Sequence, residues 1–150
     1  MIAARTAQAG LVARIWNSLL KNVDPESATK ILTAAIQSDA MAAGQTFASQ
    51  APHGPTLEHF ATILERWQEN DALTIRDVRL AGSTLTFTVT DCAYAGAYAG
   101  MGLSPELGAI LSCARDEPFA NGYSPCLSMR RSQTIMLGHP CCHFTFAWRE

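Results

Sequence analysis

The spacing of apolar residues changes near residue 70, and this change limits the fold more than any other feature of the sequence. Before it, apolar side chains recur at three- and four-residue steps, the period of an amphipathic helix. Beyond it the period falls to two, which is typical of half-buried strands in an antiparallel sheet. We therefore expect a single α+β domain over residues 1–150, with a helical half of about 1–70 and a sheet-forming half of about 71–150.

Three helices are expected in the first half. The first carries one apolar stripe, formed by Val12, Ile15, Trp16, Leu19, Leu20 and Val23. Asp24 is then expected to cap a second helix that ends near Gly44. Pro25 would be its first residue, where the missing N–H of proline has no cost. After a loop rich in Pro and Gly, Thr56 can cap a third helix. Its buried face would be Leu57, Phe60, Ala61, Leu64 and Trp67.

The second half predicts an antiparallel sheet of about four strands in two hairpins, packed against the N-terminal helices and against inserted ones. A turn at residues 81–83 joins a strand with Val78 and Leu80 to one in which apolar residues alternate with threonines. Asp91 and Ser104 are expected to cap two inserted helices. The last strands are expected over residues 127–137 and 141–149, with a turn at 138–140.

Charge and composition exclude several classes of function. The formal net charge is −2 and no run of basic residues occurs, so no nucleic acid or anionic membrane surface is expected as a partner. Lys and Arg interrupt every long apolar stretch, so none can span a bilayer, and the N-terminus does not have the pattern of a signal peptide. We expect a cytoplasmic protein whose five cysteines stay reduced.

The segment CCHFTFAW near the C-terminus places two cysteines next to each other in a predicted strand. Alternation puts Cys142 on the face of Phe144 and the following aromatic residues, and Cys141 with His143 on the other. Two adjacent cysteines that point apart cannot serve one compact metal site, and no paired CxxC unit is present, so no metal is expected. Cys142 is either a small buried hydrophobe or a functional thiol. His143 is either a solvated polar residue or part of a site.

Cys113 and Asp116 stand three residues apart, which places both on one side of a helix. A carboxylate disfavours a neighbouring thiolate. The pair therefore indicates a carboxylate base with an auxiliary thiol, a thiol activated by a residue distant in sequence, or a buried cysteine beside a helix-end aspartate.

Arg131 has the strand parity of Met129 and Ile135, on the apolar side of the predicted strand, whereas Arg130 is expected to face solvent. A buried arginine must be paired, because an unpaired charge costs several kcal/mol. Its partner is Asp116, another acid, or a ligand carboxylate. Tyr94 and Tyr98, one helical turn apart, either line a pocket for a planar ligand or pack in the core.

Several short motifs in the last sixty residues resemble the L-2-amino-thiazoline-4-carboxylic acid hydrolase family. They are Cys-x-Tyr-Ala at residues 92–95, Gly-Leu at 102–103, Cys-x-x-Asp at 113–116, Gly-Tyr-x-Pro at 122–125, Arg-Ser-Gln-Thr at 131–134 and Gly-x-x-x-Cys-x-Phe at 138–144. The sequence departs from the pattern at His143, where an aspartate is expected, and at Ser132, where a threonine is expected. The closing strand is also similar to small-molecule-binding domains related to four-vinyl protochlorophyllide reductases, which implies a helix-backed antiparallel sheet and a homodimer.

The resemblance implies cofactor-free, ring-opening hydrolysis of a small carboxylated heterocycle at the carbon between two heteroatoms, giving a carbamoyl amino acid. It implies Cys113 or Cys142 as nucleophile, or water activated by Asp116, with Asp116 in proton transfer and Arg131 on the substrate carboxylate. Further candidates for substrate binding are Cys92, Tyr94, Tyr98, Thr134 and His143. The alternatives are a non-catalytic binding or sensor domain with the same pocket, and a metal site of Cys113, Cys142 and His143.

Overall fold

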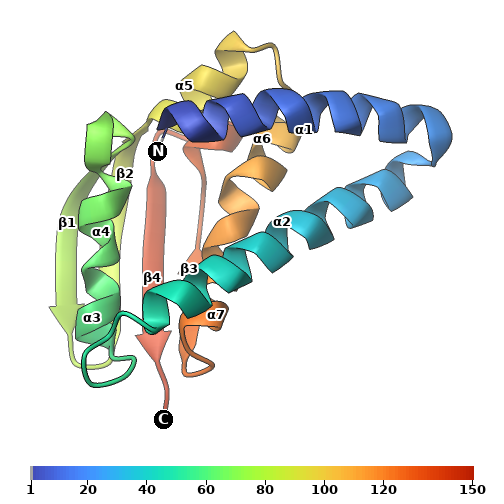
Figure 1. Ribbon diagram of the computed structural model, residues 1–150. Helices are drawn as coiled ribbons and strands as arrows, with labels where there is room; N and C mark the ends of the chain where they lie inside the picture. Colours follow the sequence, from blue (N-terminus) through green and yellow to red (C-terminus); the bar gives the residue numbers. More distant parts are fainter. Residues whose placement is uncertain (1) are drawn as a thin grey trace.

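The computed structural model describes residues 2–150 and has the expected α+β architecture, with the helices gathered on one side of a four-stranded sheet (Figure 1). The long helices are α1 (Ile2–Asn22) and α2 (Pro25–Ala48), followed by α3 (Leu57–Ala61) and α4 (Ile63–Trp67). The inserted helices are α5 (Ala93–Gly100), α6 (Pro105–Leu111) and α7 (Asp116–Tyr123). The strands are β1 (Leu73–Ala81), β2 (Thr84–Cys92), β3 (Leu127–Arg131) and β4 (Cys142–Trp148). Short 3-10 helices are η1 (Glu69–Asp71), η2 (Cys113–Arg115) and η3 (Ile135–Leu137).

The sheet has the order β1-β2-β4-β3, and every neighbouring pair is antiparallel. Its inner face carries the residues that the two-residue period predicted to be buried: Leu85, Phe87, Val89, Cys142, Phe144 and Phe146. Phe87 lies opposite Phe144 in the ladder, with ring centroids 4.9 Å apart. The burial of these side chains under the helices confirms the predicted alternation of β2 and β4.

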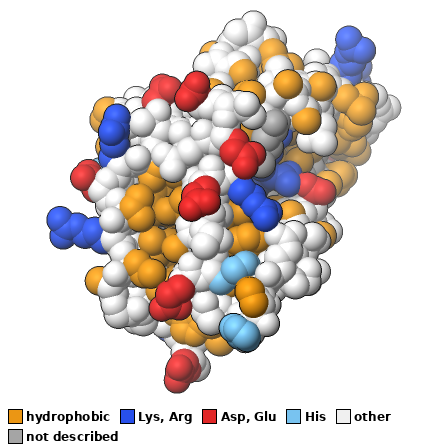
Figure 2. Space-filling model, turned by 60° about the vertical axis from the view of Figure 1, so that its left-hand side comes forward, with side chains coloured by type: hydrophobic (Ala, Val, Ile, Leu, Met, Phe, Trp, Pro, Cys, Tyr) orange, Lys and Arg blue, Asp and Glu red, His pale blue; other side chains and the backbone are white. Residues whose placement is uncertain are grey.

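The two longest helices diverge from the body of the molecule, and the turn that joins them lies farthest from the sheet (Figure 1). This turn has the predicted cap, because the carboxylate of Asp24 accepts a hydrogen bond from the Ser27 N–H at 2.9 Å and Pro25 opens α2. Among residues 2–150, no helix combines the length and the apolar composition that crossing a membrane requires. Charged side chains of both signs are scattered over the face seen in Figure 2, with hydrophobic side chains exposed between them.

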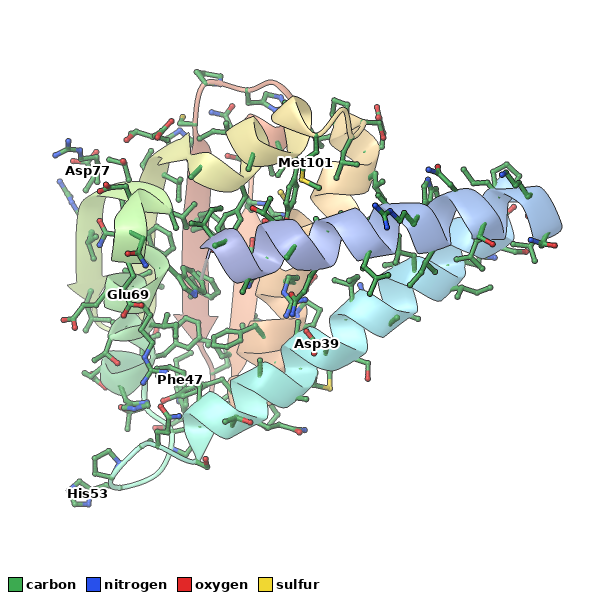
Figure 3. The ribbon with its side chains drawn as sticks, turned by 45° about the horizontal axis from the view of Figure 1, so that its top comes forward. Asp39, Phe47, His53, Glu69, Asp77 and Met101 are labelled. Carbon is green, nitrogen blue, oxygen red and sulfur yellow. The ribbon has the colours of Figure 1, made fainter. Side chains whose placement is uncertain are left out.

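Two glycines let α2 and α7 cross with their backbones in close contact. A Cβ atom at Gly44 would lie 2.1 Å from the carbonyl oxygen of Phe119, and one at Gly122 would lie 2.2 Å from that of Met41. Neither position therefore tolerates a side chain. Near this crossing, the guanidinium of Arg115 forms an ion pair of 2.5 Å with the carboxylate of Asp39 on α2. Asp39 is labelled in Figure 3. These contacts hold the start of α7, and with it Asp116, in a fixed place.

Some boundaries differ from the sequence-based expectation. Asp91 does not cap α5, because it still pairs with Thr74 in the sheet and Cys92 takes the cap position without a side-chain hydrogen bond. The predicted third helix is divided into α3 and α4 at Thr62. The second helix runs past Gly44 to Ala48, since this glycine is required for the crossing with α7 rather than as a helix end.

The largest error is the predicted length of the strand over residues 127–137. β3 ends at Arg131, and η3 follows, closed by Gly138 in a left-handed conformation with φ 94. The apolar spacing of Ile135 and Leu137 therefore belongs to a turn, in which the Ile135 N–H donates to Cys142 Sγ at 3.2 Å instead of to a strand partner. Gln133 consequently does not share the face of Arg131.

Candidate functional site

A cavity of about 70 Å³ lies between the inner face of the sheet and the helices. Its lining contains most of the residues that the sequence singled out: Cys92, Tyr94, Cys113, Asp116, Arg131, Thr134 and Cys142. They come from β2, α5, η2, α7, β3, the turn after β3, and β4, so segments far apart in the sequence meet here. A water needs about 10–15 Å³ of such space, so the cavity has room for several waters or for one small organic molecule.

Arg131 is paired within the protein. Its guanidinium donates to the Asp116 carboxylate at 2.5 Å and to the carbonyl oxygen of Cys113 at 3.1 Å. It also lies over the ring of Phe144, with Cζ 5.5 Å from the centroid. Of the partners considered for this arginine, the structure confirms Asp116.

Asp116 is a partly buried carboxyl group with a raised pKa. Burial raises its pKa to about 6, although the charge of Arg131 acts in the opposite direction. A carboxyl with such a pKa is ionised in most molecules at neutral pH and can still take up and return a proton. A carboxyl group that lines a cavity and has a raised pKa is typical of residues that act in acid–base catalysis.

The three thiols in the cavity stay protonated at neutral pH. Burial, and then the charge of Asp116, raise the pKa of Cys113 to about 12. Burial also raises the pKa of Cys92 and that of Cys142. Because the thiolate is the nucleophilic form, these cysteines are poor nucleophiles in the free protein.

Thr134 brings an unsatisfied polar group to the cavity. The residue is 7% exposed, and its hydroxyl oxygen is the only buried side-chain nitrogen or oxygen within residues 2–150 that lacks a hydrogen-bond partner. Buried polar groups are nearly always satisfied, so this hydroxyl is an exception among the residues that line the cavity.

Arg5 of α1 is a second cation at the cavity, and sequence reasoning missed it. Its Cζ lies 5.2 Å from the ring centroid of Tyr94, and no ion pair to it occurs within residues 2–150. It also borders an adjoining cavity of about 230 Å³ on the α2 side, together with Trp67 and Asp116. The signal was present, because Arg5 precedes Ala9 and Val12 by four and seven residues and so lies on their stripe.

Tyr98 and His143 lie outside the cavity. Tyr98 packs in the core between the helices, with its ring 6.3 Å from that of Tyr94. His143 lies on the exposed face of β4, where its Nδ1 meets the Thr88 hydroxyl at 3.0 Å. The hypothesis that Cys113, Cys142 and His143 hold a metal together is therefore wrong, because the sheet separates His143 from the two thiols.

The fold is similar to that of a solved sensory domain. It resembles the crystal structure of the phenol-responsive sensory domain of the transcription activator PoxR with phenol, with a TM-score of 0.56 and 11% sequence identity. The match covers 96% of this chain and 74% of that one. At this identity the likeness establishes the fold alone, in keeping with the expected helix-backed antiparallel sheet. No curated protein has a significant match to the sequence.

The sequence also matches a family model over nearly its whole length. The model describes L-2-amino-thiazoline-4-carboxylic acid hydrolase and matches residues 4–146, which include every residue of the cavity lining. The N-terminal helices thus belong to the match, in addition to the C-terminal motifs that suggested it. The chain belongs to the L-2-amino-thiazoline-4-carboxylic acid hydrolase family.

Proposed function

We propose that the protein hydrolyses a small, carboxylated cyclic amidine of the 2-amino-thiazoline-4-carboxylate type, with Asp116 as the group that transfers protons. One observation carries the proposal above the others: a carboxyl with its pKa raised to about 6 stands at the wall of a cavity with room for a small ligand. The family name supports hydrolysis as the reaction class.

In the proposed reaction a water molecule adds to the ring carbon that lies between nitrogen and sulfur. Asp116, in its ionised form, takes a proton from this water as the carbon–oxygen bond forms. The carbon–sulfur bond then breaks as the hydroxyl becomes a carbonyl. The sulfur leaves with the proton that Asp116 returns, and the hydroxyl proton passes to the ring nitrogen that was doubly bonded to the carbon. The product is a carbamoyl amino acid with a free thiol, and it differs from the substrate by one water.

Water is favoured over a cysteine as the nucleophile. Cys113 holds its proton up to a pH of about 12, because it is buried and lies beside Asp116. A neutral thiol attacks carbon slowly, and no base other than Asp116 reaches the cavity from the residues that line it. In this proposal Cys113 and Cys142 shape the cavity with polarisable walls and form no covalent bond to the substrate.

Arg5 is proposed as the residue that binds the substrate carboxylate. Arg131 was the expected candidate, yet its Nη1 already donates to Asp116 and to a backbone carbonyl, and its charge is paired with Asp116. Arg5 forms no ion pair within residues 2–150, although its charge acts on Asp116 from a distance, and it lines the same cavity. A guanidinium binds a carboxylate through two parallel hydrogen bonds, which orients a small ring as well as retaining it. Arg131 then acts as a positioning residue, which holds Asp116 in place.

Turnover of defined compounds tests this proposal. The purified chain is incubated with 2-amino-thiazoline-4-carboxylate and with the same ring lacking the carboxylate, and products are followed by mass spectrometry and by released thiol. We expect a product one water heavier from the first compound and much slower turnover of the second. Asp116→Asn should abolish the product, whereas Glu117→Gln, an exposed neighbour on the same helix, should not. An active Asp116→Asn variant would refute the assignment.

A non-catalytic binding or sensor role is the second candidate. Its support is the fold shared with a phenol-responsive domain and a cavity with apolar walls and few polar groups. Under this alternative, native mass spectrometry would show a bound ligand that is released unchanged, and no cyclic amidine would be converted.

A further inference from the structure

A second cluster of chemically active side chains lies on the outer face of the sheet, away from the cavity. The Sγ of Cys141 lies 3.3 Å from Nε2 of His143, and the amide nitrogen of Gln133 donates to the same sulfur at 3.1 Å. The other ring nitrogen of His143 meets the hydroxyl of Thr88 at 3.0 Å. A nucleophile beside a base that a third residue orients is the arrangement found in activated thiols.

The hydrogen bonds of this cluster suit a charged thiolate–imidazolium pair. If the proton moves from Cys141 to His143, Nε2–H donates to the sulfur and Nδ1–H donates to the Thr88 oxygen. The Gln133 N–H then supplies a second donor to the negative sulfur. In this form both ring nitrogens of His143 and the sulfur of Cys141 have partners, a geometry suited to a nucleophilic thiol.

The position of Cys141 and its histidine partner distinguish this thiol from the other four. His143 is exposed and Cys141 is half-buried, whereas Cys92, Cys113 and Cys142 border the inner cavity. Cys126 is also half-buried, and its sulfur forms no hydrogen bond in the structure within residues 2–150. Cys126 is therefore the natural comparison, because it matches Cys141 in exposure and lacks a histidine.

We propose that Cys141, with His143 and Gln133, is a thiol–disulfide exchange site that takes low-molecular-weight disulfides from solution. The sulfur of Cys141 attacks one sulfur of the disulfide, a new bond joins the two, and the old sulfur–sulfur bond breaks. His143 takes the proton from Cys141 and returns it to the leaving thiolate. The protein thiol is oxidised to a mixed disulfide, and the reagent is reduced to one thiol. This proposal is independent of the hydrolysis proposed for the cavity.

Timed peptide mapping of the full chain in excess hydroxyethyl disulfide tests the site. We expect Cys141 to acquire the hydroxyethylthio group roughly tenfold or more faster than Cys126, as an activated thiol should. His143→Ala should slow the reaction at Cys141 by a similar factor, whereas His53→Ala, in a loop that points into solvent (Figure 3), should not. His143→Gln provides a second variant that keeps a donor and loses the base, with folding checked by circular dichroism. Equal rates at Cys141 and Cys126, or an unchanged rate at Cys141 in both folded His143 variants, would overturn the proposal.

Discussion

The carboxylate of Asp116 and the guanidinium of Arg131 form an ion pair of 2.5 Å at the wall of the cavity, with side-chain exposures of only 25% and 16%. The pair joins the start of α7 to the last residue of β3. It keeps the carboxylate oriented while burial keeps the pKa of Asp116 near 6. The proposed chemistry depends on both effects.

Replacing the arginine should leave a buried charge without a partner. Arg131→Met is expected to lower the free energy of unfolding at neutral pH by roughly 3 kcal/mol, measured by urea titration. The loss should shrink at about pH 4, where Asp116 of the variant is protonated and neutral. Arg130→Met, the exposed neighbour, should change stability by less than about 0.5 kcal/mol. If Arg131→Met lowers the free energy of unfolding equally at both pH values, the loss of the ion pair with Asp116 is not the cause.

Arg5 should contribute to substrate binding more than to the chemical step. Arg5→Met is expected to raise KM roughly tenfold or more and to change kcat little, because the carboxylate contact is present both before and during the reaction. Arg14→Met, on the exposed part of the same helix, should have no effect on either constant. If Arg5→Met lowers kcat and leaves KM unchanged, Arg5 does not hold the substrate carboxylate.

Removing the unsatisfied hydroxyl of Thr134 should weaken ligand binding without weakening the fold. Thr134→Val keeps the shape of the side chain and removes a buried polar group that has no partner, so the free protein should be as stable as the wild type or more stable. Ligand affinity should fall roughly tenfold, the value of one hydrogen bond. Calorimetric unfolding and ligand titration measure the two effects. Loss of stability without loss of affinity would show that the hydroxyl serves the fold.

Catalysis should survive the removal of either thiol that was considered as a nucleophile. Cys113→Ala and Cys142→Ala are each expected to retain turnover within about tenfold of wild type, as changes outside the covalent chemistry do. Cys142→Ala should also lose about 1 kcal/mol of stability, because the Ile135 N–H loses its sulfur acceptor. Cys126→Ala, distant from the cavity lining, serves as the control. Abolished turnover in folded Cys113→Ala would favour a cysteine nucleophile over water.

Local periodicity was enough to predict the parts of the site that lie on regular elements. The two-residue alternation of β4 placed Cys142 inward and Cys141 with His143 outward, as the structure has them. The parity of Arg131 required a partner and named Asp116 as one candidate, and the structure has this pair. Cys113 and Asp116, expected on one helix, lie instead in two successive ones, η2 and α7. The parity held for Arg131 because it is the last residue of β3, although the strand was predicted to continue.

The remaining errors concern contacts that depend on distant segments. Tyr94 and Tyr98 lie on one face of α5, and only the position of α1 and α6 determines that Tyr94 meets the cavity and Tyr98 does not. Arg5 lies on the apolar stripe of α1, but only the packing of α1 against α5 brings it to the cavity. The turn after β3 has the spacing of a strand in part, since Ile135 and Leu137 of η3 stand two apart, although Met136 between them is the buried residue.

The pH dependence of kcat/KM for 2-amino-thiazoline-4-carboxylate is the measurement that tests the central claim most directly. If Asp116 acts as the base in its ionised form, kcat/KM should rise with pH and level off above a pKa of about 6, and Asp116→Asn should lack both the rise and the activity. Glu117→Gln should reproduce the wild-type profile. A wild-type profile that is flat through this range, or an Asp116→Asn variant that keeps the same rise, would contradict the account.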